Sequence, residues 1–387
     1  MKHKITALVM LGESGSSKPE QLVHQARRKS AIQTVVKLSK IKDIQDIIVA
    51  VPSAEKHNWI QEDEYHHISK SIIWDIDSPN HRYNFGHRIS SIVQKYQIKK
   101  MLYLGGGSMP LLQDQTLRSI ISKLSQSSIN YAITNNLHSS DWIGINNALI
   151  ITDLIDQLPR DNMFAWLLKN EYDFTIESLK PSTETLLDID TPNDLLALRW
   201  HPNTEETLRA FLINKLPTQA QNKWLNAANI MSKPGSRVTL IGRVSPQVCQ
   251  MLQAKLQVWT RIFSEERGMT ARKNNRIDKI QSIIGNFVDL NGADLFFQNL
   301  DQMIDVGYMD TRVYLAQQNK YPTRSERFAS DLYQTKNIKH QALKKLVVAS
   351  LKCNAPIILG GHGSVSGGLY SLIDCIKQQS SQETNIL

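Results

Sequence analysis

Short apolar runs alternate with segments of helical period along the first half of the chain, up to about residue 200. The runs have the length of strands, and the segments between them repeat apolar residues every three or four positions, which indicates alternating strands and amphipathic helices. The predicted strands are residues 5–11, 46–51, 72–75, 100–104, 131–134, 142–145 and 174–178, and the predicted helices are 20–39, 85–96, 113–125, 148–157 and 162–169. Strands joined in this way form a mostly parallel sheet with helices on both faces, so we expect an α/β fold, with an antiparallel insertion between 142 and 178.

The pattern changes after Pro202. Residues 217–236 are polar and flanked by proline and glycine, as is typical of a linker. Beyond them, two strand-like runs at 238–241 and 356–359 stand among helical segments. A chain of 387 residues exceeds the size at which one hydrophobic core keeps growing. We therefore predict a first domain over 1–202, a linker region over 203–236, and an α-rich second domain with a small sheet over 237–387.

Cysteine usage and hydropathy predict a cytoplasmic protein. The chain has three cysteines, an odd number: Cys249, Cys353 and Cys375. They lie far apart in the sequence, at neither metal-ligand nor redox spacing, which is typical of reduced thiols. No apolar run reaches about 18 residues, and the first dozen residues do not read as a secretory leader. We expect neither a membrane partner nor secretion.

The formal net charge of +9, from 45 basic and 36 acidic residues, predicts an anionic partner. The densest basic stretch, residues 261–276, is interrupted by two glutamates, as on a solvated surface. The chain shows no motif that reads nucleic acid and no exposed aromatic series. A phosphorylated small molecule is therefore favoured over nucleic acid.

The loop after the first predicted strand is the first of three candidate ligand loops, because open parallel sheets bind ligands beyond the carboxyl ends of their strands. Small residues let backbone N–H groups approach an anion where a helix begins, and Lys18 can reach a phosphate. The residues expected to touch a nucleotide here are Leu11, Gly12, Gly15 and Ser16. An ordinary flexible turn between strand and helix is the alternative interpretation.

The second candidate loop follows the strand predicted at 100–104, and the third spans residues 188–195. Gly105, Gly106, Gly107 and Ser108 form a run that permits positive φ and close approach of a ligand, although tight packing of the next helix would also account for the glycines. In the third loop, Asp-Ile-Asp-Thr-Pro-Asn-Asp-Leu (188–195), a threonine caps a helix that begins at a proline. The two carboxylates before the cap, Asp188 and Asp190, are candidate metal ligands.

The strand and loop order, the Gly-Gly-Ser-Met-Pro-Leu-Leu segment (106–112) and the Asp-Ile-Asp-Thr-Pro-Asn-Asp-Leu segment resemble the MobA-like NTP transferases over about residues 4–200. The resemblance implies a GT-A-like Rossmannoid fold and transfer of a nucleotidyl group from an NTP to a small phosphorylated acceptor, a sugar phosphate or cofactor precursor. It further implies release of pyrophosphate with the assistance of Mg²⁺. The catalytic residues would be Lys18, Asp188 and Asp190, of which the two aspartates would hold the metal.

Two positions depart from the family pattern. The first loop keeps Gly12, Gly15 and Lys18 but lacks an arginine and has a shifted spacing. Ser108 stands where the family usually has a metal-binding aspartate, and a hydroxyl is a much weaker ligand for Mg²⁺ than a carboxylate. A catalytically degenerate nucleotide-binding or regulatory protein is therefore the alternative function.

The second half contains a glycine-rich turn and several arginines beside small or acidic residues. Gly361, His362, Gly363 and Ser364 follow an apolar run, where a helix start with open N–H groups predicts anion binding. The candidate cationic partners are Arg243, Arg267, Arg312 and Arg327, which could instead form structural ion pairs. We expect a second anionic-ligand site here, serving either a second reaction step or regulation.

Overall fold

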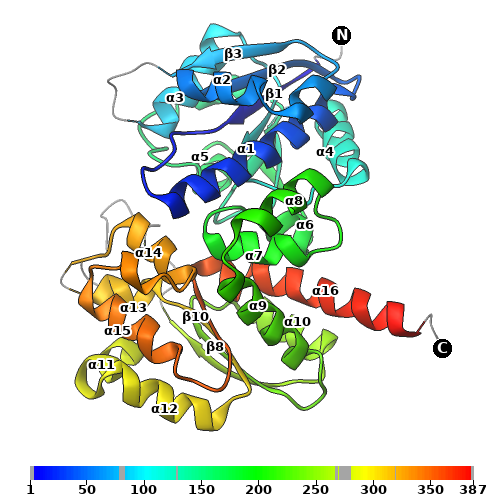
Figure 1. The fold of residues 1–387 in the computed structure, drawn as a ribbon. Helices are drawn as coiled ribbons and strands as arrows, with labels where there is room; N and C mark the ends of the chain where they lie inside the picture. The colour runs from blue at the N-terminus through cyan, green and yellow to red at the C-terminus, as the bar shows by residue number, and fades with distance from the viewer. Residues whose placement is uncertain are drawn as a thin grey trace. The chain divides into compact units, whose positions relative to one another are not determined.

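The computed structural model describes residues 4–77, 83–127, 130–265, 269, 280–318 and 320–384. Its contacts divide the chain into two compact units. The first contains Met1–Ser14 and His24–Asp188, and the second contains Gly15–Val23 and Ile189–Leu387. Each unit is built around its own sheet (Figure 1).

The first unit contains a seven-stranded sheet in the order β3-β2-β1-β4-β6-β5-β7. The strands are β1 (Ile5–Met10), β2 (Ile44–Val51), β3 (Ile72–Ile76), β4 (Met101–Gly105), β5 (Tyr131–Thr134), β6 (Trp142–Ile145) and β7 (Thr175–Ser178). β6 runs antiparallel to both of its neighbours, and every other neighbouring pair is parallel. The predicted mostly parallel α/β sheet, with its antiparallel insertion, is confirmed.

Helices cover both faces of this sheet because side chains of β1 alternate between two cores. Ile5, Ala7 and Val9 pack with residues of one side, and Leu8 and Met10 with residues of the other. The first side carries α1 (Lys18–Ser39), α2 (Ser53–Ile60) and α4 (Asp114–Gln126), and the second carries α3 (Phe85–Lys95) and α5 (Phe164–Glu171). The segment predicted as a helix over 148–157 forms only a short 3₁₀ helix, Ala148–Thr152.

A buried carboxylate, Asp75 on β3, stabilises the edge of this sheet. It accepts hydrogen bonds from Arg88 (2.5 Å), Lys95 (2.7 Å) and the Tyr96 hydroxyl (2.8 Å). Burial alone would raise the pKa of Asp75, but the hydrogen bonds from Lys95, Tyr96 and Arg88 outweigh it and lower the pKa below its ordinary value. A depressed pKa means that the ionised group stabilises the fold above its unfolded pKa of about 4, and that this contribution is lost as the pH falls through the folded pKa.

We expect Asp75→Asn to lower the free energy of unfolding by about 3 kcal/mol at neutral pH, because two cations lose their buried partner. The difference from the wild type should shrink as the pH falls below about 4, where the wild-type carboxyl is protonated too. Urea unfolding of both proteins between neutral and acidic pH measures this, with Asp156→Asn, whose side chain is 86% exposed, as the control. A difference that does not vary with pH would contradict the assignment.

The second unit contains a four-stranded sheet, all parallel, in the order β11-β10-β8-β9. The strands are β8 (Arg237–Gly242), β9 (Trp259–Ser264), β10 (Val306–Asp310) and β11 (Ile357–Gly360). The sequence predicted β8 and β11 and missed the other two. β9 has no clear apolar pattern because its Trp-Thr-Arg-Ile-Phe-Ser run begins the basic stretch, and β10 has none because it is short and contains a glycine and an aspartate.

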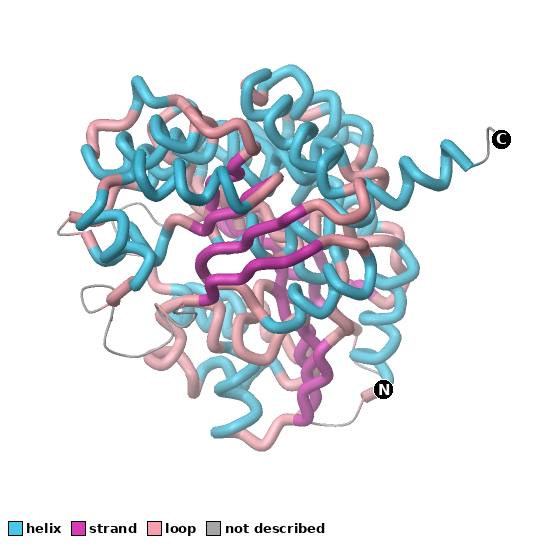
Figure 2. Tube along the Cα trace, turned by 90° about the horizontal axis from the view of Figure 1, so that it is seen from below, coloured by secondary structure: helices cyan, strands magenta, loops and turns pink. Residues whose placement is uncertain are grey.

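Helices make up most of the rest of the second unit, and Figure 2 shows the helices of the chain in cyan and its strands in magenta. They are α7 (Pro192–Trp200), α8 (Glu206–Lys215), α9 (Thr218–Met231), α10 (Pro246–Lys255), α11 (Ile283–Asn291), α12 (Ala293–Met303), α13 (Arg312–Gln317), α14 (Arg324–Asp331), α15 (Gln341–Ser350) and α16 (Gly367–Thr384). Among the described residues, no helix combines the length and the hydropathy needed to cross a membrane.

The region predicted as a linker, 203–236, is mostly helical, which corrects that prediction. α9 buries Ala220, Trp224, Ala227, Ala228 and Met231, and this spacing of three and four residues is that of a helix face. Small alanines among polar residues concealed the pattern. The contacts also place residues 189–202 with the second unit, whereas the sequence predicted that they belong to the first domain.

Candidate functional site

The strand order of the first unit reverses between β1 and β4, and this is where an open α/β sheet binds ligands. The loops after these two strands touch each other. Gly106 N donates to Met10 O at 2.8 Å, and a Cβ at Gly106 would lie only 2.6 Å from Leu11 Cδ1. The structure therefore brings together two of the three loops that the sequence singled out.

The glycine run after β4 serves close packing and does not supply a left-handed backbone. Among the described glycines, φ is positive at Gly235, Gly242 and Gly292, whereas in this loop the left-handed residue is Met109 (φ 51°). Gly106 faces Leu11, and a Cβ at Gly105 would lie 2.9 Å from Ser108 Oγ. Side chains here would separate the two loops.

Ser108 and Asp188 are paired by an isolated antiparallel β-bridge, so the third loop begins beside the second. The buried Ser108 side chain donates from Oγ to Asp141 O at 2.7 Å. Asp188 is half-buried. The position that carries an aspartate in the resembling family thus lies next to one of the two predicted metal ligands.

Tyr103 and Asp161 form a further polar pair in the first unit. The buried Tyr103 hydroxyl donates to Asp161 Oδ2 at 3.1 Å, and burial, followed by the negative charge of Asp161, raises the pKa of the phenol far above its ordinary value. Asp188 adds a smaller contribution of the same sign. The sequence did not single out this pair, because the tyrosine lies inside an apolar strand and its partner 58 residues away.

The end of the first loop belongs to the second unit and is held by its own side chains. Ser17 and Glu20 exchange hydrogen bonds at the start of α1, with Ser17 Oγ donating to Glu20 Oε2 at 2.8 Å, and Glu20 also pairs with Arg324 at 2.8 Å. Ser16 and Lys18 are exposed. Lys18 is the first residue of α1.

The third loop ends in a capping box at the start of α7. The backbone N–H groups of Asp190 and Thr191 donate to Asp194 Oδ2 at 3.1 and 2.7 Å, and Thr191 Oγ1 donates to it at 2.9 Å. Burial, with the nearby charge of Asp190, raises the pKa of Asp194 to about 7. Asp194 is therefore structural, and Asp190 is the exposed carboxylate of this segment.

The glycine-rich turn after β11 packs against this capping box within the second unit. A Cβ at Gly363 would lie 2.0 Å from Asp194 Oδ1, and one at Gly360 would lie 2.5 Å from Asn193 Nδ2, which donates to Leu359 O. Close packing thus explains these glycines without a ligand. Ser364 Oγ donates to Gly361 O at 2.7 Å, and His362 is exposed.

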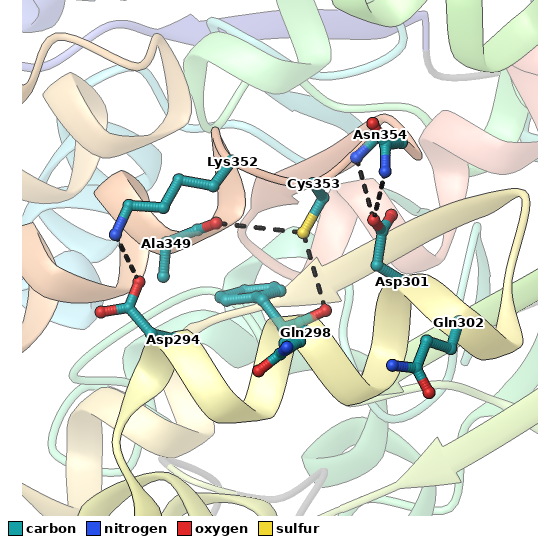
Figure 3. Close-up of a pocket in the computed structure, with 9 residues that line it drawn as sticks. Asp294, Gln298, Asp301, Gln302, Ala349, Lys352, Cys353 and Asn354 are labelled. Atoms are coloured by element: carbon teal, nitrogen blue, oxygen red, sulfur yellow. Dashed lines mark hydrogen bonds and ion pairs between the residues drawn. The ribbon is translucent and has the colours of Figure 1, made fainter.

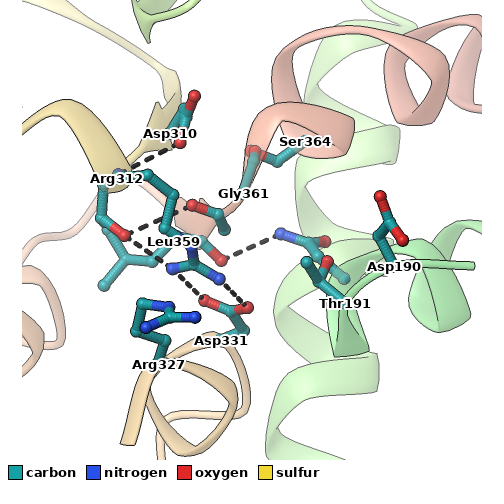
Figure 4. A network of polar contacts seen from close by, with 12 residues as sticks. Asp190, Thr191, Asp310, Arg312, Arg327, Asp331, Leu359, Gly361 and Ser364 are labelled. Carbon is teal, nitrogen blue, oxygen red and sulfur yellow. Dashed lines mark hydrogen bonds and ion pairs between the residues drawn. The ribbon is translucent and has the colours of Figure 1, made fainter. Parts of the chain in front are cut away.

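The predicted arginines that the structure describes are held by neighbouring groups, and Figure 4 shows Arg312 and Arg327 among them. Arg312 donates to both carboxylate oxygens of Asp331, at 3.1 and 2.7 Å. Arg243 donates to both oxygens of Asp310, and Arg327 lies over the ring of Tyr321. The remaining candidate, Arg267, lies outside the described residues.

A cavity of about 500 Å³ lies between α12 and the end of α15 (Figure 3). Asp294 pairs with Lys352 at its rim, and Asp301 accepts from Asn354. Burial and the charge of Asp301 raise the pKa of Cys353 to about 11, so its thiol is protonated and weakly nucleophilic at neutral pH. This cavity lies at the amino ends of β10 and β11, whereas parallel sheets bind ligands at the carboxyl ends.

No family model and no curated protein matches the chain. Solved structures similar to it include a cytidylyltransferase from Leptospira borgpetersenii (17% identity, 56% of this chain and 92% of that chain, TM-score 0.37). Another is a 4-diphosphocytidyl-2C-methyl-D-erythritol synthase from Anaerococcus prevotii (13% identity, 54% of this chain and 96% of that chain, TM-score 0.37). A glycosyltransferase from Streptococcus pneumoniae aligns over 92% of this chain and 91% of its own chain, with 11% identity and a TM-score of 0.33.

Proposed function

We propose that the chain transfers a nucleotidyl group from an NTP to a small phosphorylated acceptor. In this reaction an acceptor phosphate oxygen attacks the α-phosphorus, the bond from that phosphorus to the bridging oxygen of the β-phosphate breaks, and pyrophosphate leaves with the electron pair. The single observation that supports it is the meeting of the loops after β1 and β4 where the strand order reverses, with Asp188 paired to Ser108 beside them.

The residues of these loops have distinct proposed roles. Backbone N–H groups of Leu11, Gly12 and residues 105–108 bind the nucleotide, and Gly15 and Ser16 continue the first loop toward the helix start. Lys18 neutralises charge on the triphosphate. Catalysis of this kind depends on positioning and on charge neutralisation more than on covalent chemistry.

Asp188 and Asp190 are the proposed ligands of Mg²⁺. Mg²⁺ is commonly held by one or two protein carboxylates together with substrate phosphates and water, which is the donor set that these two residues can offer. The described residues contain no group of three or more His, Cys, Asp or Glu side chains arranged for a metal. The donor set therefore suits a metal that arrives with the triphosphate, where it would neutralise negative charge.

The test is pyrophosphate release from ATP, GTP, CTP and UTP with Mg²⁺ and a panel of sugar phosphates, together with thermal shifts for nucleotide binding. We expect Asp188→Asn to reduce turnover about 100-fold or more while the protein stays folded. Asp156→Asn, which removes an exposed carboxylate elsewhere in the first unit, should not change it.

Two other outcomes would contradict parts of this proposal. Nucleotide binding without turnover across the panel would identify a degenerate nucleotide-binding protein, which the hydroxyl at position 108 would explain. Turnover that is equal in the wild type and in Asp188→Asn would remove Asp188 from the reaction.

A further inference from the structure

The loops after β8 and β10 lie where the strand order of the second sheet reverses. β8 continues through α10 to β9 on one side of the sheet, whereas β10 continues to β11 on the other. The two connections depart in opposite directions, and it is at the carboxyl ends of the strands beside such a point that open parallel sheets bind ligands. None of the residues assigned above to nucleotidyl transfer lies in these two loops.

Arg243, the first residue after β8, reaches across to Asp310 at the end of β10. Its Nε and Nη2 donate to the buried Asp310 carboxylate at 2.6 and 3.2 Å, while 21% of the arginine side chain stays exposed. Burial alone would raise the pKa of Asp310, but the adjacent guanidinium outweighs it and lowers the pKa, so the pair is ionised. Within the described part of the chain, Nη1 of Arg243 has no hydrogen-bond partner.

A guanidinium that is clamped along one edge presents its other edge as a rigid fork. Such a fork matches two oxygens of a phosphate, and little side-chain entropy remains to be lost when the ligand binds. The neighbouring acidic groups are engaged elsewhere. Asp331 is bonded to Arg312, and Glu265, at the end of β9, accepts from Ser282 Oγ at 2.7 Å.

The backbone beside Arg243 also favours an anion. α10 begins at Pro246, directly after this loop, and its ten residues direct their positive end toward the carboxyl edge of the sheet. Gly242 adopts φ +111°, and its missing side chain lets the loop lie directly against Asp310. Helix end and guanidinium thus come from one short segment.

We propose that the second unit binds a phosphate group beside Arg243 at the carboxyl ends of β8 and β10, as a free ion or as part of a phosphomonoester, and that Arg243 holds it through its outer edge. The proposal does not depend on nucleotidyl transfer. It assigns to the second unit a ligand that carries a phosphate group, and it predicts that Arg243 determines the affinity for that group.

Calorimetric titration of the full chain with inorganic phosphate, and separately with glycerol 3-phosphate, tests this. Arg243→Gln should weaken binding at least about tenfold, because the ligand loses a charge-assisted pair of hydrogen bonds. The affinity of Arg243→Lys should lie between those of the wild type and Arg243→Gln, since lysine keeps the positive charge but lacks the two-pronged guanidinium geometry. Tighter binding of glycerol 3-phosphate than of phosphate would identify a phosphomonoester, and equal binding would identify the phosphate group alone.

A matched control lies at the other end of the same strand. Arg237 also donates to both oxygens of an aspartate, Asp305, so Arg237→Gln makes an equivalent change at the amino edge of the sheet and should leave the affinity unchanged. Because Arg243→Gln leaves a buried carboxylate unpaired, the double variant Arg243→Gln/Asp310→Asn replaces the ion pair with neutral amides. It should fold and still lose binding.

Three results would overturn the proposal. They are the absence of saturable binding by the wild type at millimolar phosphate, equal affinities of the wild type and Arg243→Gln, and loss of binding in Lys18→Gln but not in Arg243→Gln. The last would place the phosphate at the nucleotide loop. None of these outcomes contradicts nucleotidyl transfer in the first unit, so the two proposals fail independently.

Discussion

Replacing Asp331 by asparagine is expected to lower the free energy of unfolding by about 3–5 kcal/mol, because it leaves a buried guanidinium without its counter-charge. Both side chains of the pair are buried, with 7% of Arg312 and none of Asp331 exposed. Arg312 donates to both carboxylate oxygens, so the substitution removes the charge and one of two matched acceptors. Chemical denaturation at neutral pH measures the loss.

The control is an ion pair of similar length at the surface of the same unit. Lys352 and Asp294 are 2.7 Å apart, with 63% and 73% of their side chains exposed, so Asp294→Asn should cost less than about 0.5 kcal/mol. The double variant Arg312→Met/Asp331→Leu, which buries no charge, should be more stable than Asp331→Asn. Comparable losses of unfolding free energy in Asp331→Asn and Asp294→Asn would show that the buried ion pair stabilises the fold no more than the exposed one.

The parallel sheet of the first unit could be predicted because each strand is a separate apolar run. Strands such as β1 and β4 are buried on both faces, and that produces a continuous apolar signal with glycines at its carboxyl end. β9 gave no such signal because it is an edge strand whose Trp259, Arg261 and Phe263 are exposed. Burial, rather than strand formation, is what the hydrophobic pattern reports.

The candidate site was predictable only as separate loops. Glycines at strand ends identified the loops after β1 and β4, and the contact between Gly106 and Leu11 brings them together. The partners of the arginines were not predictable, because Asp310 and Asp331 lie 67 and 19 residues from Arg243 and Arg312, and sequence spacing carries no record of such contacts.

The role of glycine in the turn after β11 shows why composition alone is ambiguous. An open anion-binding turn and a turn that packs closely on a neighbouring helix both require the absence of a side chain. At Gly363 the space for a Cβ is filled by Asp194, so packing is a sufficient cause. The sequence could not distinguish these causes, because Asp194 precedes the turn by more than 160 residues.

Gly242→Ala is the second substitution with a large expected effect, because both the backbone conformation at this glycine and the lack of space around it exclude a side chain. Its φ is +111°, and a Cβ would lie 2.7 Å from Asp310 Cβ and 2.8 Å from Asp310 O. Backbone strain of this kind costs about 1–3 kcal/mol, and the clash is with backbone that cannot move without disturbing β10, so we expect a total loss of about 3 kcal/mol or more.

Gly235 separates the two causes. It has a similar positive φ, +81°, but open space around the position of a Cβ, so Gly235→Ala should cost only about 1 kcal/mol of backbone strain. Urea unfolding of the two variants beside the wild type gives the clash as the difference between them. If Gly242→Ala were no less stable than Gly235→Ala, the loop after β8 would have to lie farther from Asp310 than the structure places it. The Arg243–Asp310 clamp, and the phosphate site that depends on it, would then lose their geometric basis.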